Sequence, residues 1–437
     1  MQHLSPLDGR YRSKTEALRP FFSEEALMRA RVEVELKYFM ALAHDPGIRE
    51  LKKLKAKQIR ALQDIIYKFG LKDALEIHEI ERKTNHDVKA VEYFLRRKFE
   101  RIGGLKHTTH FLHFGLTSED VNNLAYGILI QRALKQVVLP SLRGTLHELQ
   151  GMARRWRKTP MLSLTHGQPA TPTTVGKECA VFADRLERQI RQLQSFRMQG
   201  KFGGAVGTYA AQRIAYPDVR WEIFGRKFIR SLRLDPLAHT TQINPHDDLA
   251  EMSHIVSRAN AILLDLSRDL WLYISRGVFR QKVIAGEVGS STMPHKVNPI
   301  DFENAEGNLG ISTALFSHFA EKLPVSRLQR DLSDSTVQRN IGIAFGYHLL
   351  AVASLRKGLG KLSLDRATVK RELADHPEVL AEGIQMLLRK HGVEGAYEQL
   401  KKLTRGAKVT HENMLKFAES LPLSKAEKER LRRWPLA

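Results

Sequence analysis

The sequence predicts an all-α protein whose body is a bundle of long helices. Apolar residues recur at alternating spacings of four and three over several long stretches, which is typical of packed bundle helices. Alternating polar and apolar residues, which would indicate strands, are nearly absent. Glycine and proline interrupt the helical pattern in three short segments, at Thr165–Thr171, Phe202–Gly207 and Ala285–Pro299. Long helices with few breaks favour a bundle.

Residues 1–115 are predicted to form a separate N-terminal helical domain, which ends at the segment His113-Phe114-Gly115-Leu116. The first long helix of the body is predicted to begin at Ser118-Glu119-Asp120. We expect this helix to kink or restart near Pro140, because proline lacks the backbone N–H that a helix interior uses. Its apolar face carries Val121, Leu124, Ala125, Ile128 and Leu129.

Three further long helices are predicted in the body. The second follows Thr171-Pro172, where threonine would be the N-cap and proline the first helical residue. The third follows His246-Asp247-Asp248, and the fourth begins near Val337. Their apolar faces carry Val175, Cys179, Phe182, Leu186, Ile190 and Leu193; Met252, Val256, Ala259, Leu263, Leu266 and Leu270; and Val337, Ile341, Ala344, Val352 and Leu355. Gly358 and Gly360 end this body, which predicts a central domain at 116–360 and a small helical C-terminal domain at 361–437.

The composition indicates a cytoplasmic protein. Cys179 is the only cysteine, so no intrachain disulfide can form and a reducing compartment is expected. The N-terminal residues include a proline and charges where a secretory signal needs an apolar stretch. No apolar run approaches the roughly 20 residues that a bilayer-spanning helix requires.

The net charge of +22 has two interpretations. A strongly basic surface attracts polyanions and could indicate a nucleic-acid-binding protein. It could equally raise the capture rate of a small anionic substrate. We favour the second interpretation, because the basic residues are spread along the chain and follow no nucleic-acid-binding motif.

The segment 286–299 has the residue types that a proton-abstracting loop needs. Two glycines make it mobile, two serines follow, and a lysine and an asparagine come at fixed offsets. A serine hydroxyl serves as a base only where water is excluded and backbone N–H groups and a cation such as Lys296 favour the alkoxide. The same cationic pocket would bind a substrate carboxylate, into which developing carbanion charge can delocalise. Taken alone, however, Gly-Ser-Ser is more typical of a flexible linker.

Other motifs predict no metal and no cofactor. The spacing His107-x-x-His110-x-x-His113 drifts off one face of a helix, and no neighbouring cysteine or glutamate completes a metal site. Gly203-Gly204-x-x-Gly207 lacks dinucleotide-binding spacing and is interpreted as a turn. The sequence also contains no Walker loop and no nucleophile elbow.

The motif Gly289-Ser290-Ser291-x-Met293-Pro294-x-Lys296-x-Asn298-Pro299 resembles the signature of the fumarase/aspartase superfamily. Its flanks in SSTMPHKVNPIDFENAEGN, together with THGQPATPTT and TNHDVKAVEYFL, resemble the adenylosuccinate lyase family in its long bacterial form. The resemblance runs from Ser5 to about Arg405-Gly406. It implies a three-domain, all-α fold with a long central helix bundle, assembled into a tetrameric helical core.

The resemblance also implies a reaction. A member of this family would release fumarate by β-elimination, converting adenylosuccinate to AMP and the succinylated aminoimidazole carboxamide ribotide of purine synthesis to its free carboxamide. By resemblance, Ser290 is the general base and His166 is the general acid that protonates the departing nitrogen. His86 remains an alternative acid, because sequence alone does not rank two histidines of one site.

The same resemblance implies a set of substrate-binding residues. Thr117 and Ser118 match a carboxylate-binding pair at a helix start, and their simple role as an N-cap is compatible with it. Arginine forks suit the oxygens of a nucleotide phosphate. The residues implied are Arg10, Tyr11, Asn85, His86, Asp87, Thr117, Ser118, Gln242, Lys296, Asn298, Asn304, Arg330, Ser335 and Arg339.

Partners and alternatives follow from the same comparison. A homotetramer with shared active sites and a small nucleotide substrate are expected, with no membrane partner. Argininosuccinate lyase, aspartase and fumarase share the serine loop, but the residues that match a phosphate site favour a nucleotide. A basic nucleic-acid-binding protein and a lyase fold that has lost activity are the alternatives from other classes. Intact Ser290, His166, His86 and Lys296 disfavour the inactive protein.

Overall fold

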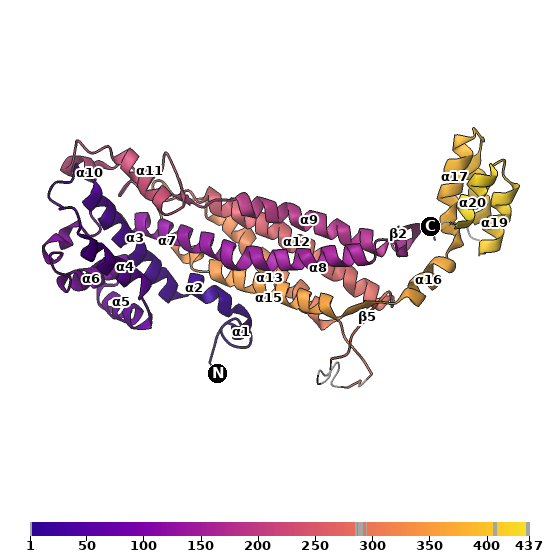
Figure 1. Ribbon diagram of the computed structural model, residues 1–437, viewed down its shortest axis with the longest axis horizontal. Coiled ribbons are helices and arrows are strands. Elements are labelled where there is room, and N and C mark those ends of the chain that lie inside the picture. The colour runs from indigo at the N-terminus through magenta and orange to yellow at the C-terminus, as the bar shows by residue number, and fades with distance from the viewer. Residues whose placement is uncertain (1, 285, 287–291, 294, 405–408, 434–437) are drawn as a thin grey trace. The chain divides into compact units, whose positions relative to one another are not determined.

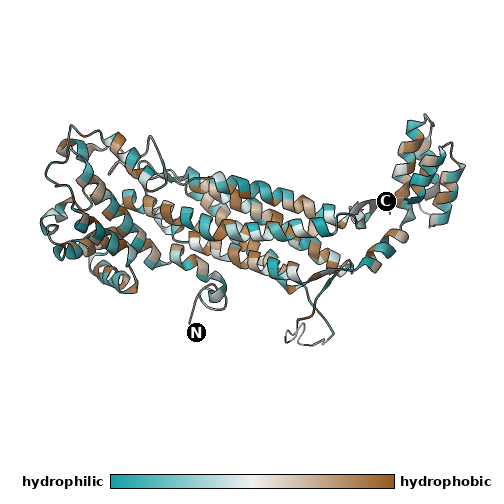
Figure 2. Cartoon of the chain, in the orientation of Figure 1, coloured by the Kyte–Doolittle hydropathy of each residue, from teal (hydrophilic) through white to brown (hydrophobic). Residues whose placement is uncertain are grey.

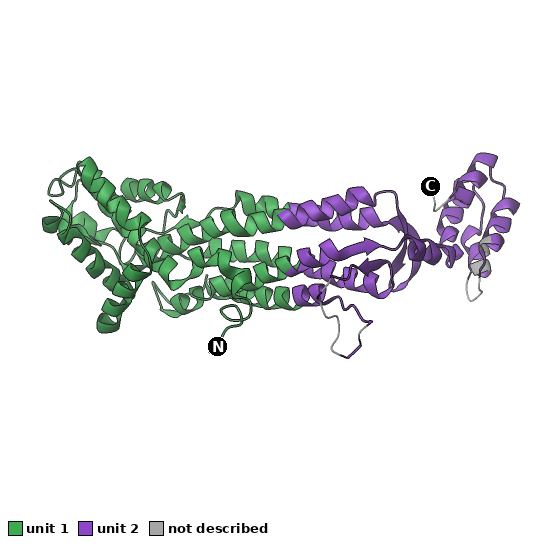
Figure 3. Ribbon diagram, turned by 60° about the horizontal axis from the view of Figure 1, so that its bottom comes forward, with its two compact units in different colours: residues 1–143, 188–261, 307–353 green, residues 144–187, 262–306, 354–437 purple. Residues whose placement is uncertain are grey.

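The computed structural model describes residues 2–284, 286, 292–293, 295–404 and 409–433. The chain forms two compact units, each built from three stretches of sequence (Figure 3). Unit 1 comprises residues 1–143, 188–261 and 307–353, and unit 2 comprises residues 144–187, 262–306 and 354–437. The described residues are mostly helical, which confirms the predicted fold class. Figure 2 shows that hydrophobic and hydrophilic residues share each of the long helices.

The N-terminal part of unit 1 consists of helices (Figure 1). Ser23 caps α3 through its Oγ, which accepts a hydrogen bond from Ala26 N at 3.2 Å. The elements are α1 Arg12–Thr15, η1 Glu16–Leu18, α2 Arg19–Phe22, α3 Glu24–His44, α4 Ala56–Tyr67, α5 Leu71–Thr84, α6 Asp87–Glu100 and η2 Lys106–Phe111.

Five long helices dominate the rest of the chain (Figure 1). They are α8 Leu139–Arg155, α9 Val175–Ser195, α12 Asp247–Ser275, α13 Ile300–Lys322 and α15 Ile341–Lys361. Before, between and after them in the chain lie α7 Ser118–Ala133, the π-helix η3 Leu134–Val138, α10 Ala210–Ala215, α11 Trp221–Ser231, α14 Ser333–Gln338, α16 Arg366–Ala374, η4 Pro377–Leu380, α17 Ala381–Lys390, α18 Ala396–Thr404, α19 His411–Ser420 and α20 Lys425–Arg433.

The predicted helices from Ser118, around Val175–Leu193 and after His246 are confirmed. The expected disturbance near Pro140 is the π-helical turn η3, in which Leu139 N donates to Leu134 O. The fourth predicted helix is wrong in its first part. Val337 lies in the short helix α14, and the carbonyl of Asn340 accepts hydrogen bonds from the first turn of α15, so the chain restarts there.

The segment Thr165–Thr171, where the sequence shows an interruption of the helical pattern, belongs to a β-hairpin. Strands β1 Pro160–Thr165 and β2 Gln168–Thr174 pair antiparallel, and Thr165 opposite Gln168 closes a two-residue turn. The predicted N-cap at Thr171-Pro172 is therefore wrong, because both residues lie in β2. Thr174 caps α9 instead, since its Oγ1 accepts from Lys177 N at 3.1 Å.

Two further strand pairs are very short. β3 Gln199–Gly200 pairs parallel with β4 Asp235–Pro236, and β5 Phe279–Gln281 pairs antiparallel with β6 Leu362–Leu364. Among the described residues, no helix is both long and apolar enough to cross a membrane.

Polar side chains join the bundle helices within each unit. In unit 1, Asn260 of α12 donates to Ser312 of α13 at 3.1 Å and hydrogen-bonds His348 Nδ1 of α15 at 2.6 Å. In unit 2, Ser354 of α15 donates to Asn304 Oδ1 of α13 at 2.7 Å. The division into three domains at residues 115 and 360 stays a prediction.

Candidate active site

The turn between α5 and α6 presents two of the predicted binding residues. Asn85 ends α5 in the left-handed region, with φ of 52°, and its side chain is exposed. His86 is the N-cap of α6, where its Nδ1 accepts from Lys89 N at 3.2 Å. This bond leaves the Nε2 edge of the exposed imidazole for a ligand.

Asp87, the first residue of α6, lies between two guanidinium groups. Its Oδ2 is 2.6 Å from Arg31 Nη2 and 3.2 Å from Arg339 Nη2. Burial alone would raise the pKa of Asp87, but the charges of Arg31 and Arg339 and the N–H of Val88 outweigh it and lower the pKa. Asp87 thus stays ionised and connects α6 to the predicted phosphate residue Arg339.

Arg31 was not among the site residues predicted from the sequence. Its side chain is 4% exposed, and besides Asp87 it donates from Nε to Asn122 Oδ1 at 2.8 Å. The available signal was a charged residue on the inward face of a helix, flanked by the buried residues Ala30 and Val32. A guanidinium so deeply buried requires partners, and here they belong to the predicted site.

Thr117 and Ser118 lie at the start of α7, as the sequence predicts. Thr117 is the N-cap, and its N–H donates to Asp120 Oδ2 at 2.9 Å. Asp120 also accepts from Gly203 N, from Gly204 N and, at 2.7 Å, from Lys201 Nζ. Asp120 and Lys201 are both fully buried, so this ion pair fixes the start of α7 against the glycine-rich segment.

The segment Phe202–Gly207 is the turn that we predicted. Gly207 has φ of 77°, and a Cβ at this position would lie 2.2 Å from the carbonyl oxygen of Thr240, so only glycine fits. The close approach places Gln242 beside the turn, where its Nε2 donates to Ala205 O at 2.8 Å. The backbone N–H of Gln242 also donates to Gln329 O, next to Arg330.

Arg330 faces a buried group of titratable side chains. Its Nη1 lies 3.6 Å from Glu119 Oε2, and ligand atoms of Glu119, His246 and Asp334 lie within 4.8 Å of one another. Burial raises the pKa of Glu119 to about 7. We interpret this group as an ion-pair cluster, because the guanidinium already supplies a positive charge. None of Glu119, His246 and Asp334 was predicted from the sequence.

Ser335 and Arg339 lie on and just after α14. Ser335 N donates to the Oδ1 of its neighbour Asp334 at 2.7 Å, and Asp334 belongs to the buried group. Arg339 lines a cavity of 170 Å³ together with residues of the N-terminal segment, including Ser5 and Asp8. Nearby in sequence, the Arg10 guanidinium lies 5.9 Å from the ring centre of Tyr11.

In unit 2, His166 lies at the tip of the β1–β2 hairpin. His166 and Gly167 have φ values of 54° and 73°, and they form the two central positions of a tight hairpin turn. The hairpin is held at its base, where Leu162 packs with Leu373 and Val379. The imidazole of His166 is exposed at the tip of this packed hairpin.

The remaining predicted residues of unit 2 belong to the segment before α13 and to α13 itself. Lys296 is exposed, and Asn298 is partly buried. Asn304 lies on α13 and accepts the hydrogen bond from Ser354. Ser290, the predicted base, lies outside the described residues.

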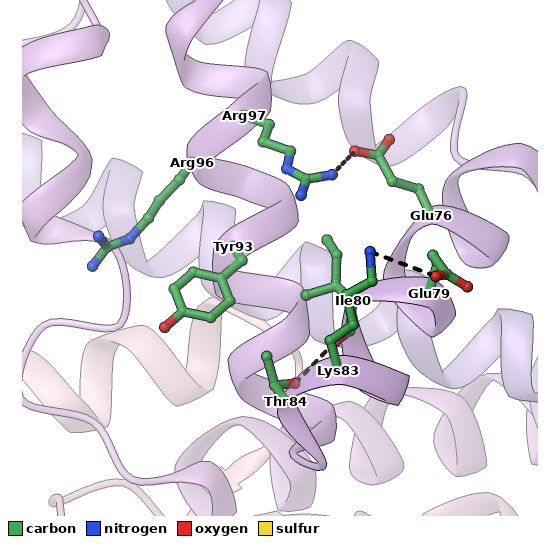
Figure 4. Close-up of a pocket in the computed structure, with 8 residues that line it drawn as sticks. All are labelled: Glu76, Glu79, Ile80, Lys83, Thr84, Tyr93, Arg96 and Arg97. Atoms are coloured by element: carbon green, nitrogen blue, oxygen red, sulfur yellow. Dashed lines mark hydrogen bonds and ion pairs between the residues drawn. The ribbon is translucent and has the colours of Figure 1, made fainter.

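A pocket on the hairpin of α5 and α6 adjoins the Asn85 turn in sequence (Figure 4). It has a volume of 480 Å³ and is lined by Glu76, Glu79, Ile80, Lys83, Thr84, Tyr93, Arg96 and Arg97. Arg97 pairs with Glu76 at 3.2 Å and Lys83 with Glu79 at 3.7 Å, so several of its charges are already partnered. It contains none of the predicted site residues.

Unit 1 therefore brings residues from three segments into contact with the segment 329–339. Asp87 contacts Arg339, the start of α7 lies beside Arg330 through Glu119, and Gln242 reaches the segment of Arg330. Histidine, hydroxyl, amide and guanidinium groups at helix starts can bind carboxylates and a phosphate. The predicted acid His166 and the residues around Lys296 belong to unit 2.

Two solved structures share the fold of this chain. The chain matches a fumarate lyase from Mesorhizobium sp. BNC1 with a TM-score of 0.76 and 19% identity, covering 95% of this chain and 93% of that one. It matches β-carboxy-cis,cis-muconate cycloisomerase from Acinetobacter calcoaceticus with a TM-score of 0.70 and 17% identity, over 96% and 93% of the two chains. The fold is that of the fumarate lyases.

Sequence relatives identify the family more narrowly. The lyase family model matches residues 9–311, and the model for the adenylosuccinate lyase C-terminal region matches residues 326–436. Adenylosuccinate lyases of Legionella pneumophila (strain Corby) and Escherichia coli (strain K12) are 51% and 50% identical, each over 98% of this chain and 94% of the relative. The relative from Dictyostelium discoideum is 46% identical over 96% and 92%. The chain belongs to the adenylosuccinate lyase family.

Proposed function

We propose that this chain cleaves adenylosuccinate to AMP and fumarate, and cleaves the succinylated aminoimidazole carboxamide ribotide in the same way. The observation that carries the proposal is the nearly full-length identity of about one half to adenylosuccinate lyases. The placement of Arg330 and Arg339 around the helix starts in unit 1 supports a phosphate-bearing substrate.

The proposed reaction is a β-elimination. Ser290 takes a proton from the succinyl carbon next to a carboxylate, and the electron pair forms the double bond of fumarate as the carbon–nitrogen bond breaks. His166 gives a proton to the departing nitrogen, so charge does not accumulate on the leaving purine. Lys296 and the pair Thr117 and Ser118 bind the succinyl carboxylates, which stabilise the carbanion character at the reacting carbon.

The active form in this proposal is a cytoplasmic homotetramer whose sites are shared between subunits. Large apolar side chains on the bundle helices support an assembly. Leu272 of α12 is 51% exposed, Ile311 of α13 is 46% exposed and Ile343 of α15 is 36% exposed. Packing bundle helices from several chains against one another would bury such side chains.

Fumarate release from adenylosuccinate tests the function directly. Purified protein should convert adenylosuccinate to AMP and fumarate without added metal or cofactor, with both products quantified by chromatography. Argininosuccinate and malate serve as control substrates. Turnover of either of these, with adenylosuccinate left intact, would refute the proposal.

A further inference from the structure

The buried cluster beside Arg330 contains more carboxylate groups than the neighbouring side chains neutralise. We define the Glu119 cluster as Glu119, His246 and Asp334, and each of these side chains is no more than 5% exposed. Among the described residues, Glu119 Oε1 and Asp334 Oδ2 are buried oxygens without a hydrogen-bond partner. A buried acceptor in this state is costly unless a proton or a cation compensates it.

The contacts around the cluster show where a proton can reside. His246 Nε2 lies 2.9 Å from Gln338 Nε2 and 3.6 Å from Asp334 Oδ2. The ion pair between Glu119 and Arg330 spans 3.6 Å, which is longer than a direct hydrogen bond. With a neutral imidazole and both carboxylates ionised, the cluster and Arg330 would together carry one net negative charge. One added proton on Glu119 makes them neutral.

A phosphate at Arg330 would change this balance. We propose that the Glu119 cluster takes up a proton when a phosphate monoester binds at Arg330. Glu119 is then a positioning residue, which pairs with the Arg330 guanidinium in the free protein and releases it to the phosphate on binding. The inference rests on the proposed nucleotide substrate. It gives Glu119 a role that requires no contact with the substrate, because the charge of Glu119 changes when the phosphate binds.

Electrostatics determines the direction in which a bound phosphate shifts the pKa of Glu119. The groups that face Glu119 are Arg330 and Asp334 from the segment at α14, His246 from the start of α12, and Lys201 from the segment after β3. A phosphate dianion would add two negative charges beside Arg330 and would compete with Glu119 for it, so the protonated carboxyl becomes favoured. In the free protein the pKa of Glu119, raised by burial, is about 7, and bound phosphate would raise it further.

Isothermal titration calorimetry with AMP as the probe measures this proton. At pH 8 the phosphate of AMP is already a dianion, since its second pKa is about 6. The ligand therefore contributes little to the proton balance. Titrations in two buffers of different ionisation enthalpy should show uptake of roughly half a proton per site in the wild type. Adenosine, which lacks the phosphate, should show none.

The affinity for AMP should also depend on pH. Because binding takes up a proton, wild-type affinity should fall on the order of 5- to 10-fold between pH 7 and pH 9. Glu119→Gln keeps the shape of the side chain but cannot titrate, so its AMP affinity should change by less than about twofold over this range and its proton uptake should vanish. Glu33→Gln is the matched control. Glu33 is also buried and ion-paired, and its pKa is lowered, although burial opposes this, by Arg132 and Lys37, so the wild-type uptake should persist.

The outcomes separate the inference from the function on which it rests. AMP binding without proton uptake in the wild type, or uptake that survives in Glu119→Gln, overturns the inference and leaves the proposed activity intact. AMP that binds no better than adenosine overturns the phosphate site itself, and the inference with it. If Glu119→Gln does not fold, the wild-type titrations still test the inference, because absence of proton uptake on AMP binding overturns it.

Discussion

The backbone at His166 explains how one side chain can be presented for proton transfer. A non-glycine residue with positive φ is uncommon, and here it results from a hairpin turn only two residues long. The following Gly167 also has positive φ, so the two residues together reverse the chain. The proposed general acid is thus presented by a paired strand element, and its imidazole is exposed.

The proposed base gives a residue-scale prediction. Ser290→Ala should lower kcat by on the order of 10³-fold or more, because it removes a group that acts only in the transition state. AMP binding measured by calorimetry should be unchanged. Steady-state kinetics on purified variants provide the measurement.

Its neighbour is the matched control. Ser291→Ala changes the same atoms one position along the loop and should cost less than about tenfold in kcat. If Ser291→Ala proved the more damaging of the two, the base would be Ser291.

At the scale of elements, the bundle in unit 1 depends on a buried polar junction of three helices. Asn260 of α12 donates to Ser312 and to Thr313 of α13, and its Oδ1 meets His348 Nδ1 of α15. Burial lowers the pKa of His348 to about 4, so the imidazole is neutral near pH 7 and donates to Asn260. One amide thus satisfies groups on both neighbouring helices.

Removing that amide should destabilise the bundle. Asn260→Ala leaves the buried N–H of His348 without its acceptor and opens a cavity, so we expect a loss of about 2 to 4 kcal/mol in the free energy of unfolding. Urea denaturation followed by circular dichroism, at one fixed protein concentration, measures it. Glu251→Ala, at an exposed position of the same helix, should change the stability by less than about 0.5 kcal/mol. Equal losses in the two variants would contradict the importance of the junction.

The long helices could be predicted because their apolar periodicity persists over many turns. The hairpin Pro160–Thr174 was missed because its prolines and threonines also suit a loop. The alternation of apolar and polar residues from Leu162 to Thr165, before a His-Gly turn, was the signal that could have revealed it. The break after α14 was missed because Val337 and Ile341 continue the helical spacing across it.

The candidate site residues also fall into two groups. Some are marked by local sequence motifs, and others depend on partners that are distant in the sequence. Residues within sequence motifs, such as Thr117 and Gln242, could be proposed from the sequence, and they lie at a helix start and beside a turn. Arg31 and Glu119 gain their roles from partners far away in the chain, Asp87 and Arg330. No local pattern specifies such pairs, because they form only when helices from different parts of the sequence pack together.

At the scale of the whole molecule, the net charge of +22 needs a physical role. A positive protein attracts an anionic substrate, and salt screens this attraction over about 8 Å at physiological ionic strength. We therefore expect kcat/KM for adenylosuccinate to fall several-fold between 20 and 200 mM salt, while kcat changes less. A kcat/KM that does not vary with salt would exclude substrate capture as the reason for the charge. A nucleic-acid gel shift with a steep salt dependence would then favour the other interpretation.

The proposed sharing of active sites between subunits leads to the last prediction. His166 is the proposed acid and Ser290 the proposed base, and the proposed tetramer takes them from different chains at each site. His166→Ala and Ser290→Ala should each be nearly inactive. After the two variants are dissociated, mixed equally and reassembled, a site receives an intact histidine with probability one half and an intact serine with probability one half.

About a quarter of the sites should therefore regain both groups, and activity should recover to roughly that fraction of wild type if the sites act independently. If both residues came from one chain, every site would retain one lesion and mixing would restore nothing. Native mass spectrometry of the two variants, one carrying a mass tag, verifies that mixed tetramers have formed. Inactive mixtures that contain such tetramers would refute shared sites, because random exchange supplies every combination of subunits that a shared site needs.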